Sequence, residues 1–129
     1  MATGFPSSTG SILTSDMYNG LVTFEIGTDQ TADYTAVIGD GYQKLVPMNK
    51  ATSVAFQIPT NASVAFPVGT VLNVLNKGAG TVTISAVTSG TTTIVSAGAV
   101  SASPTLGTAK MAACVKVATD TWYVVGAIA

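Results

Sequence analysis

Short stretches in which apolar and polar residues alternate recur along this chain of 129 residues. A β-strand places successive side chains on opposite sides of its sheet, so such alternation is typical of a strand with one buried face. Residues 71–75 and 122–125 have a mixed pattern, which predicts strands covered on both faces. The apolar residues that we expect on buried strand faces are Val22, Phe24 and Ile26; Val54, Phe56 and Ile58; Val82 and Ile84; and Met111, Ala113, Val115 and Val117.

Glycine and proline separate these stretches at intervals of about 8–12 residues, which is typical of proteins built from short strands. Gly78-Ala79-Gly80 predicts a hairpin turn, and the low-complexity residues 88–108 predict either a weak hairpin or an extended loop. We therefore expect an all-β protein of about eight strands, folded as a β-sandwich or a jelly-roll-like single domain. Residues 21–129 would form this domain, and residues 1–20 would form an N-terminal arm.

The expected arm is rich in Ser, Thr and Gly and has only isolated apolar residues. One hypothesis is that it docks on a neighbouring subunit and becomes ordered there. The other is that it is a frayed terminus without a role. Under the first hypothesis, the residues expected to bind the partner are Phe5, Ile12, Leu13, Met17 and Tyr18.

Charged residues make up only 9% of the chain, with five Lys, no Arg and six acidic residues. This is too little positive charge for the basic surface of a nucleic-acid-binding protein. Every apolar stretch is interrupted well before the roughly 18 residues that a membrane-spanning helix needs, and the N-terminus lacks the pattern of a secretory signal. Interface cores are depleted in charge, which favours a subunit of an assembly. A solitary β domain with a Thr/Ser-rich surface is the alternative.

The chain has few residues that carry chemistry. It contains no His and one Cys, so a Ser or Cys nucleophile would lack its usual base, and an internal disulfide is excluded. Cys114 is predicted to be a small buried residue of a strand. Asp29, Asp33 and Asp40 lie in predicted loops, where Asp commonly stabilises turns. We expect no catalytic residues, no metal and no cofactor, and hence no enzyme.

Two longer segments carry a more specific pattern, supported by a few residues upstream of them. The first is NASVAFPVGT at 61–70, followed by Val74, Gly78, Gly80 and TVTI at 81–84; the second is KVATDTWYVVG at 116–126; upstream are Tyr34-Thr35, Asp40, Met48-Asn49 and Ile58-Pro59. Together they resemble a small β module of tailed-phage structural proteins, which include head-fibre, capsid-decoration and tail-associated proteins. The resemblance covers residues 34 to about 128.

This resemblance implies a non-enzymatic virion protein without catalytic or cofactor-binding residues. The absence of a coiled-coil or collagen-like stalk favours a capsid decoration (cement) protein over a long fibre. Such a protein would bind the major capsid protein on the outer capsid surface as a homodimer or homotrimer. Lys44, Lys50 and Lys77 would then either meet acidic capsid patches or stay solvated.

The alternative is a head-fibre or tail-tip adhesin that binds host-surface glycans through Tyr, Trp, Asn and Asp on loops. In either case we expect Phe56, Phe66 and Trp122 in the structural core. Burial of the Trp122 ring would connect one sheet to the other, so that its replacement by Ala would cost about 3–5 kcal/mol.

Overall fold

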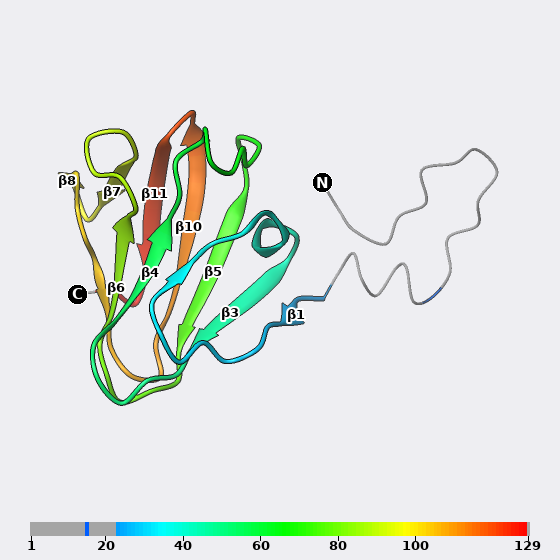
Figure 1. Cartoon of the computed structure of the whole chain (residues 1–129), viewed down its shortest axis with the longest axis vertical. Coiled ribbons are helices and arrows are strands. Elements are labelled where there is room, and N and C mark those ends of the chain that lie inside the picture. Colours follow the sequence, from blue (N-terminus) through cyan, green and yellow to red (C-terminus); the bar gives the residue numbers. More distant parts are fainter. Residues whose placement is uncertain (1–14, 16–22, 129) are drawn as a thin grey trace.

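The computed structural model describes Ser15 and residues 23–128, and the expected arm residues Phe5, Ile12, Leu13, Met17 and Tyr18 lie outside this part of the chain. The regular secondary structure of the described part consists of β-strands and one short 3₁₀ helix (Figure 1). Its elements are β1 (Glu25–Ile26), β2 (Tyr34–Thr35), the 3₁₀ helix η1 (Ile38–Gly41), β3 (Lys44–Met48), β4 (Val54–Ile58), β5 (Val71–Asn76), β6 (Val82–Ala86), β7 (Thr93–Ser96), β8 (Ala99–Val100), β9 (Thr105–Leu106), β10 (Met111–Ala118) and β11 (Thr121–Gly126). The expected all-β class is confirmed.

The strands form two mixed sheets. The large sheet has seven strands in the order β1-β3-β5-β10-β11-β7-β8, and the small sheet has four in the order β2-β4-β6-β9. From β1 to β7 the chain changes sheet after every strand, so neighbours such as β3 and β5, or β4 and β6, are parallel. Parallel strands need a crossover connection, and here a strand of the other sheet provides it.

This crossing corrects the prediction of a hairpin turn at Gly78-Ala79-Gly80. The segment instead carries the chain from β5 in the large sheet to β6 in the small sheet. It runs beside the crossing from β3 to β4, and the Gly80 amide donates to the Lys50 carbonyl at 2.9 Å. A Cβ on Gly80 would lie only 1.9 Å from the Thr52 carbonyl oxygen. Glycine is therefore required by the close approach of two backbones.

One hydrophobic core contains residues of both sheets. In β4 and β6 the expected alternation is confirmed: Val54, Phe56 and Ile58 are buried, and so are Val82 and Ile84. Strands of the two sheets overlap in the view of Figure 1, and buried residues of both sheets belong to the same cluster. The remaining core members are Ala36, Val46, Met48, Phe66, Leu72, Val74, Ile94, Leu106, Ala112, Cys114, Trp122 and Val124.

Strand β10 has the opposite orientation from the one we expected. Ala112, Cys114 and Lys116 face the core, whereas Met111 and Val117 are exposed. The prediction chose the more apolar of the two alternating sets. That choice was wrong because the inward lysine finds hydrogen-bond acceptors inside the fold.

Two further expectations are wrong. Phe24 and Ile26 are exposed, because β1 is an edge strand of two residues that pairs with β3 through its backbone; Val22 lies outside the described residues. Strand β11 is covered on one face only, with Trp122 buried and Tyr123 exposed. In residues 88–108, β7 and β8 form an antiparallel hairpin, which is one of the two alternatives for that segment.

Candidate functional site: an apolar sheet face

The face of the large sheet that points away from the core is mainly apolar, with a polar pair, Thr121 and Thr93, at one end of it. Strand pairing aligns its side chains in three rows that cross the strands, because directly paired residues project to the same side of a sheet. We call these residues the outer apolar face. The rows are Val71, Val115, Tyr123, Val95 and Val100; Ile26, Leu45, Asn73, Ala113 and Val125; and Pro47, Leu75 and Met111.

None of the residues on the outer apolar face is charged, and several are widely exposed. Val100 is 69% exposed, Ile26 65%, Val125 55%, Tyr123 46% and Met111 44%. Single exposed apolar residues are common on protein surfaces, but a contiguous set on adjacent strands marks a surface that binds something.

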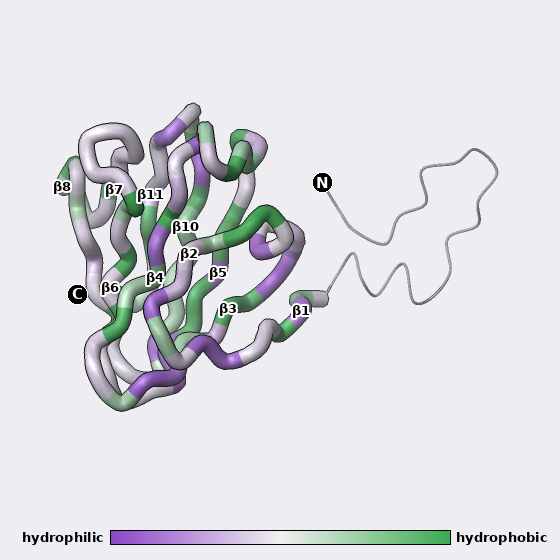
Figure 2. The backbone as a smooth tube through the Cα atoms, in the orientation of Figure 1, coloured by the Kyte–Doolittle hydropathy of each residue, from purple (hydrophilic) through white to green (hydrophobic). Residues whose placement is uncertain are grey.

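The outward face of the small sheet is different. It carries mainly hydroxyl and amide side chains, which water solvates well, although its strands come from the same Thr- and Val-rich sequence. The members given by strand pairing are Thr35, Gln57 and Ser85, and Ala55, Thr83 and Thr105. The apolar surface is therefore a property of one face and not of the composition as a whole. Figure 2 colours the backbone by the hydropathy of each residue, so that apolar and polar residues can be followed along each strand.

Two hollows adjoin the outer apolar face. One has a volume of about 410 Å³ and includes Phe24, Val68 and Val71 in its lining, and the other has about 240 Å³ and includes Met111 and Val125. Asn73 lines both hollows and is 9% exposed. Among the described residues its side-chain amide makes no hydrogen bond, so it offers a donor and an acceptor on an otherwise apolar surface.

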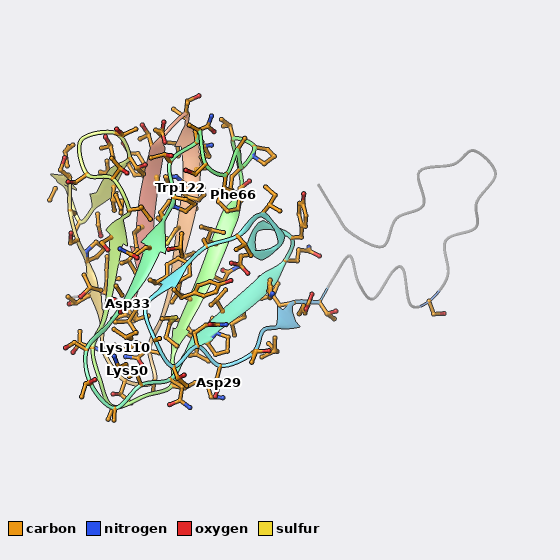
Figure 3. All side chains as sticks on the ribbon, in the orientation of Figure 1. Asp29, Asp33, Lys50, Phe66, Lys110 and Trp122 are labelled. Carbon is orange, nitrogen blue, oxygen red and sulfur yellow. The ribbon has the colours of Figure 1, made fainter. Side chains whose placement is uncertain are left out.

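Charged side chains lie elsewhere in the described part of the chain. Figure 3 places Asp29, Lys50 and Lys110 toward one end of the molecule, away from Phe66 and Trp122. Lys77 forms an ion pair with Asp29 at 2.9 Å. The hydrogen bond from Lys77 is the main cause that holds the pKa of Asp29 below its usual value. Lys77, one of the lysines considered for acidic capsid patches, is thus engaged within the chain itself.

Asp40 occupies a second, buried ion-pair site at η1. One of its carboxylate oxygens accepts hydrogen bonds from the Tyr34 hydroxyl at 2.6 Å and from the Val37 amide at 2.9 Å. The other oxygen lies 3.5 Å from Nζ of Lys44, also considered for capsid patches. Burial, assisted by the hydrogen bond to Asp40, raises the pKa of Tyr34 above its ordinary value of 10.0. These contacts anchor η1 to β2 and β3.

Two further carboxylates, those of Asp33 and Asp120, also hold loops in place through hydrogen bonds. Asp33 accepts a hydrogen bond from the Ala55 amide at 2.9 Å, and Asp120 accepts one from the Asn61 amide at 2.7 Å. Cys114 is fully buried, and burial raises the pKa of its thiol to about 12. A thiol in this environment stays protonated and is a poor nucleophile.

Three aromatic residues expected in the core lie there: Phe56, Phe66 and Trp122 are between 0 and 3% exposed. Phe66 and Trp122 meet edge to face, with ring centroids 5.5 Å apart, and Figure 3 shows them as neighbours. Edge-to-face contact is favourable for aromatic quadrupoles. Trp122 is consequently not available at the surface for stacking on a sugar ring.

Comparison of this chain with family models, with curated proteins and with solved structures gives no match. Among the described residues there is no group of three or more His, Cys, Asp or Glu residues that could hold a metal ion. Within the same residues, no helix has the length and apolarity to cross a membrane.

Sequence reasoning missed the outer apolar face. It assigned Met111, Ala113 and Val115 to the core, although they form part of this surface. The sequence of β11 did contain a sign of this surface. Neither of its two alternating sets, Trp122 with Val124 and Tyr123 with Val125, includes a charged residue. A strand that is solvated on one face normally carries polar residues there.

Proposed function

We propose that this chain is a non-enzymatic assembly protein of a tailed-phage virion, which decorates the outer capsid surface and cements neighbouring major capsid subunits. The observation that carries the proposal is the uncharged outer apolar face of the large sheet. The resemblance of residues 34–128 to phage structural modules supplies the identity of the partner. We also propose that the two sheets and their shared core form a β-sandwich, because residues of both sheets contribute to one cluster.

The mechanism is burial of surface. A stable protein–protein contact removes about 1,200–2,000 Å² of total surface from water, and apolar area contributes about 25 cal/mol for each Å². The outer apolar face brings no charge that must be desolvated. Asn73 gives the contact one polar point that fixes its register. Because the same contact recurs over a shell, modest individual affinities add up by multivalency.

The binding test uses one added charge on each of two faces. Val125→Asp places a carboxylate on the outer apolar face, where it must be desolvated on docking, and Thr35→Asp places one on the exposed outward side of the small sheet. Capsids that lack the protein are mixed with each purified variant and sedimented. We expect Thr35→Asp to bind like the parent chain and Val125→Asp to lose at least about tenfold in affinity, equivalent to about 1.4 kcal/mol.

The sedimentation result for the parent chain tests the cement function itself. If it does not cosediment with capsids, the cement function is wrong. Equal binding by Val125→Asp and the parent would leave cementing intact but would remove the outer apolar face as the contact. Light scattering of the free protein tests the homodimer or homotrimer that forms part of the same proposal.

The alternative function, a glycan-binding adhesin, has less support. An adhesin needs aromatic residues at the surface, but Trp122, one of the residues considered for this role, is only 1% exposed. A glycan screen with saturable binding, together with no binding to capsids, would favour the adhesin.

A further inference from the structure

Lys116 is buried in the fold without a carboxylate partner among the described residues. It lies on the inward side of β10 and is 2% exposed. Its Nζ donates to the Asn61 side-chain oxygen Oδ1 at 2.6 Å and to the Phe66 carbonyl oxygen at 2.6 Å. The same nitrogen lies 5.9 Å from the centre of the Trp122 ring. Both polar contacts of this amine are therefore with neutral carbonyl oxygens.

Asn61 is held in place from the other side. Its backbone amide donates to Oδ1 of Asp120 at 2.7 Å, and the Thr92 hydroxyl donates to the same oxygen at 3.3 Å. Asp120 lies in the turn between β10 and β11, next to the strand that carries Lys116. The Asn61 side chain and the lysine nitrogen thus meet between two restrained segments that are 55 residues apart in the sequence.

This geometry brings an amine to an amide carbonyl carbon. A carbonyl bond is about 1.2 Å long, so Nζ lies within about 3.8 Å of Cγ of Asn61. Reacting groups held at about 3–3.5 Å in a fixed orientation gain effective molarities of about 10⁵ M or more. We propose that Lys116 and Asn61 join covalently in an intramolecular isopeptide bond, which links β10 to the loop between β4 and β5.

The reaction balances without any co-reactant. Once Nζ has released its extra proton to solvent, it forms a bond to Cγ, and the bond between Cγ and Nδ2 of Asn61 breaks. One proton passes from Nζ to Nδ2, which leaves as ammonia. No group is oxidised or reduced, and the product is an ordinary secondary amide. The cross-link closes a long loop of the chain, which restricts the unfolded state and thereby stabilises the fold.

The proposal is independent of the capsid-binding function, and mass spectrometry tests it on the full chain. The folded protein is expected to be lighter than its sequence by about 17 Da, the mass of one ammonia. Trypsin cleaves after lysine and releases residues 51–77, 111–116 and 117–129 from the unlinked chain. The cross-link blocks cleavage after Lys116, so we expect one branched peptide that joins 51–77 to 111–129.

Matched variants locate the bond. Asn61→Ala and Lys116→Met should each restore the full mass, whereas Lys110→Met, which changes another lysine of the described chain, should keep the loss of ammonia. The parent chain alone decides the question if a variant fails to fold.

Two outcomes would overturn the proposal. One is full mass after prolonged incubation of the folded parent. The other is a loss of ammonia with cleavage after Lys116 intact, because a succinimide at any asparagine loses the same mass without a branch.

Discussion

Val124 and Val125 provide a direct test of which side of β11 faces the core. They are neighbours of the same residue type, yet Val124 is 1% exposed and Val125 is 55% exposed. Replacing valine by alanine removes two carbon atoms, which is worth about 1.6 kcal/mol when the side chain is fully buried. The cavity left in the core should raise the cost of Val124→Ala to about 2–3 kcal/mol. For Val125→Ala the loss should be below about 1 kcal/mol, because half of the side chain is already in water.

Chemical denaturation of the parent and the two variants, followed by tryptophan fluorescence, measures these costs. The free energies of unfolding should fall in the order parent, Val125→Ala, Val124→Ala, with an unchanged dependence on denaturant. In a thermal scan, a loss of 2 kcal/mol corresponds to a Tm lower by about 7–9 °C for a domain of this size. Dilute protein is used, so that contacts between copies do not stabilise Val125. If Val125→Ala costs as much as Val124→Ala, the assignment of the outer apolar face is refuted.

Three further predictions concern single sites. Burial raises the pKa of Tyr34 above 10.0, so the stability that this residue contributes is present below pH 10 and is lost as the pH rises above 10. Unfolding midpoints measured between pH 8 and 11 should therefore fall less steeply with pH for Tyr34→Phe than for the parent chain. Cys114 should react with a thiol reagent only after unfolding, and rapid labelling of the folded chain would contradict its burial. Gly80→Ala should destabilise the fold by about 2 kcal/mol or more, because its Cβ would meet the Thr52 carbonyl. Gly39 has open space around it, so the control variant Gly39→Ala should change the free energy of unfolding by less than about 1 kcal/mol. Equal costs of the two variants would show that the crossings from β3 to β4 and from β5 to β6 are not in close contact.

The buried lysine explains why the orientation of β10 could not be predicted from its pattern. Alternation predicts that a strand has two different faces, and the apolar set is then assigned to the core. In β10 the set with the lysine is inside, because Asn61 and Phe66 supply acceptors for Nζ. Those acceptors lie on a loop far away in the sequence, so no local pattern indicates them.

The amino-acid sequence by itself determined the class of the fold and much of its interior. β-Branched residues in alternation predict strands, and in β4 and β6, where the outward residues are small or polar, the pattern also indicates the correct buried face. The scarcity of charge predicts a protein that works through contact, and this expectation motivates the proposed function.

Only the tertiary structure decided which face of β10 and β11 is covered, and which strands become neighbours. From β1 to β7 the chain changes sheet after every strand, so β3 pairs with β5 although β4 lies between them in the sequence. Strand β5 pairs on its other side with β10, which is still further along the chain. Which of the two sides of such a strand is buried depends on which side the rest of the fold covers with complementary shape and hydrogen-bond acceptors. That is a property of packing, because burial is decided by residues that are distant in the sequence and adjacent in space.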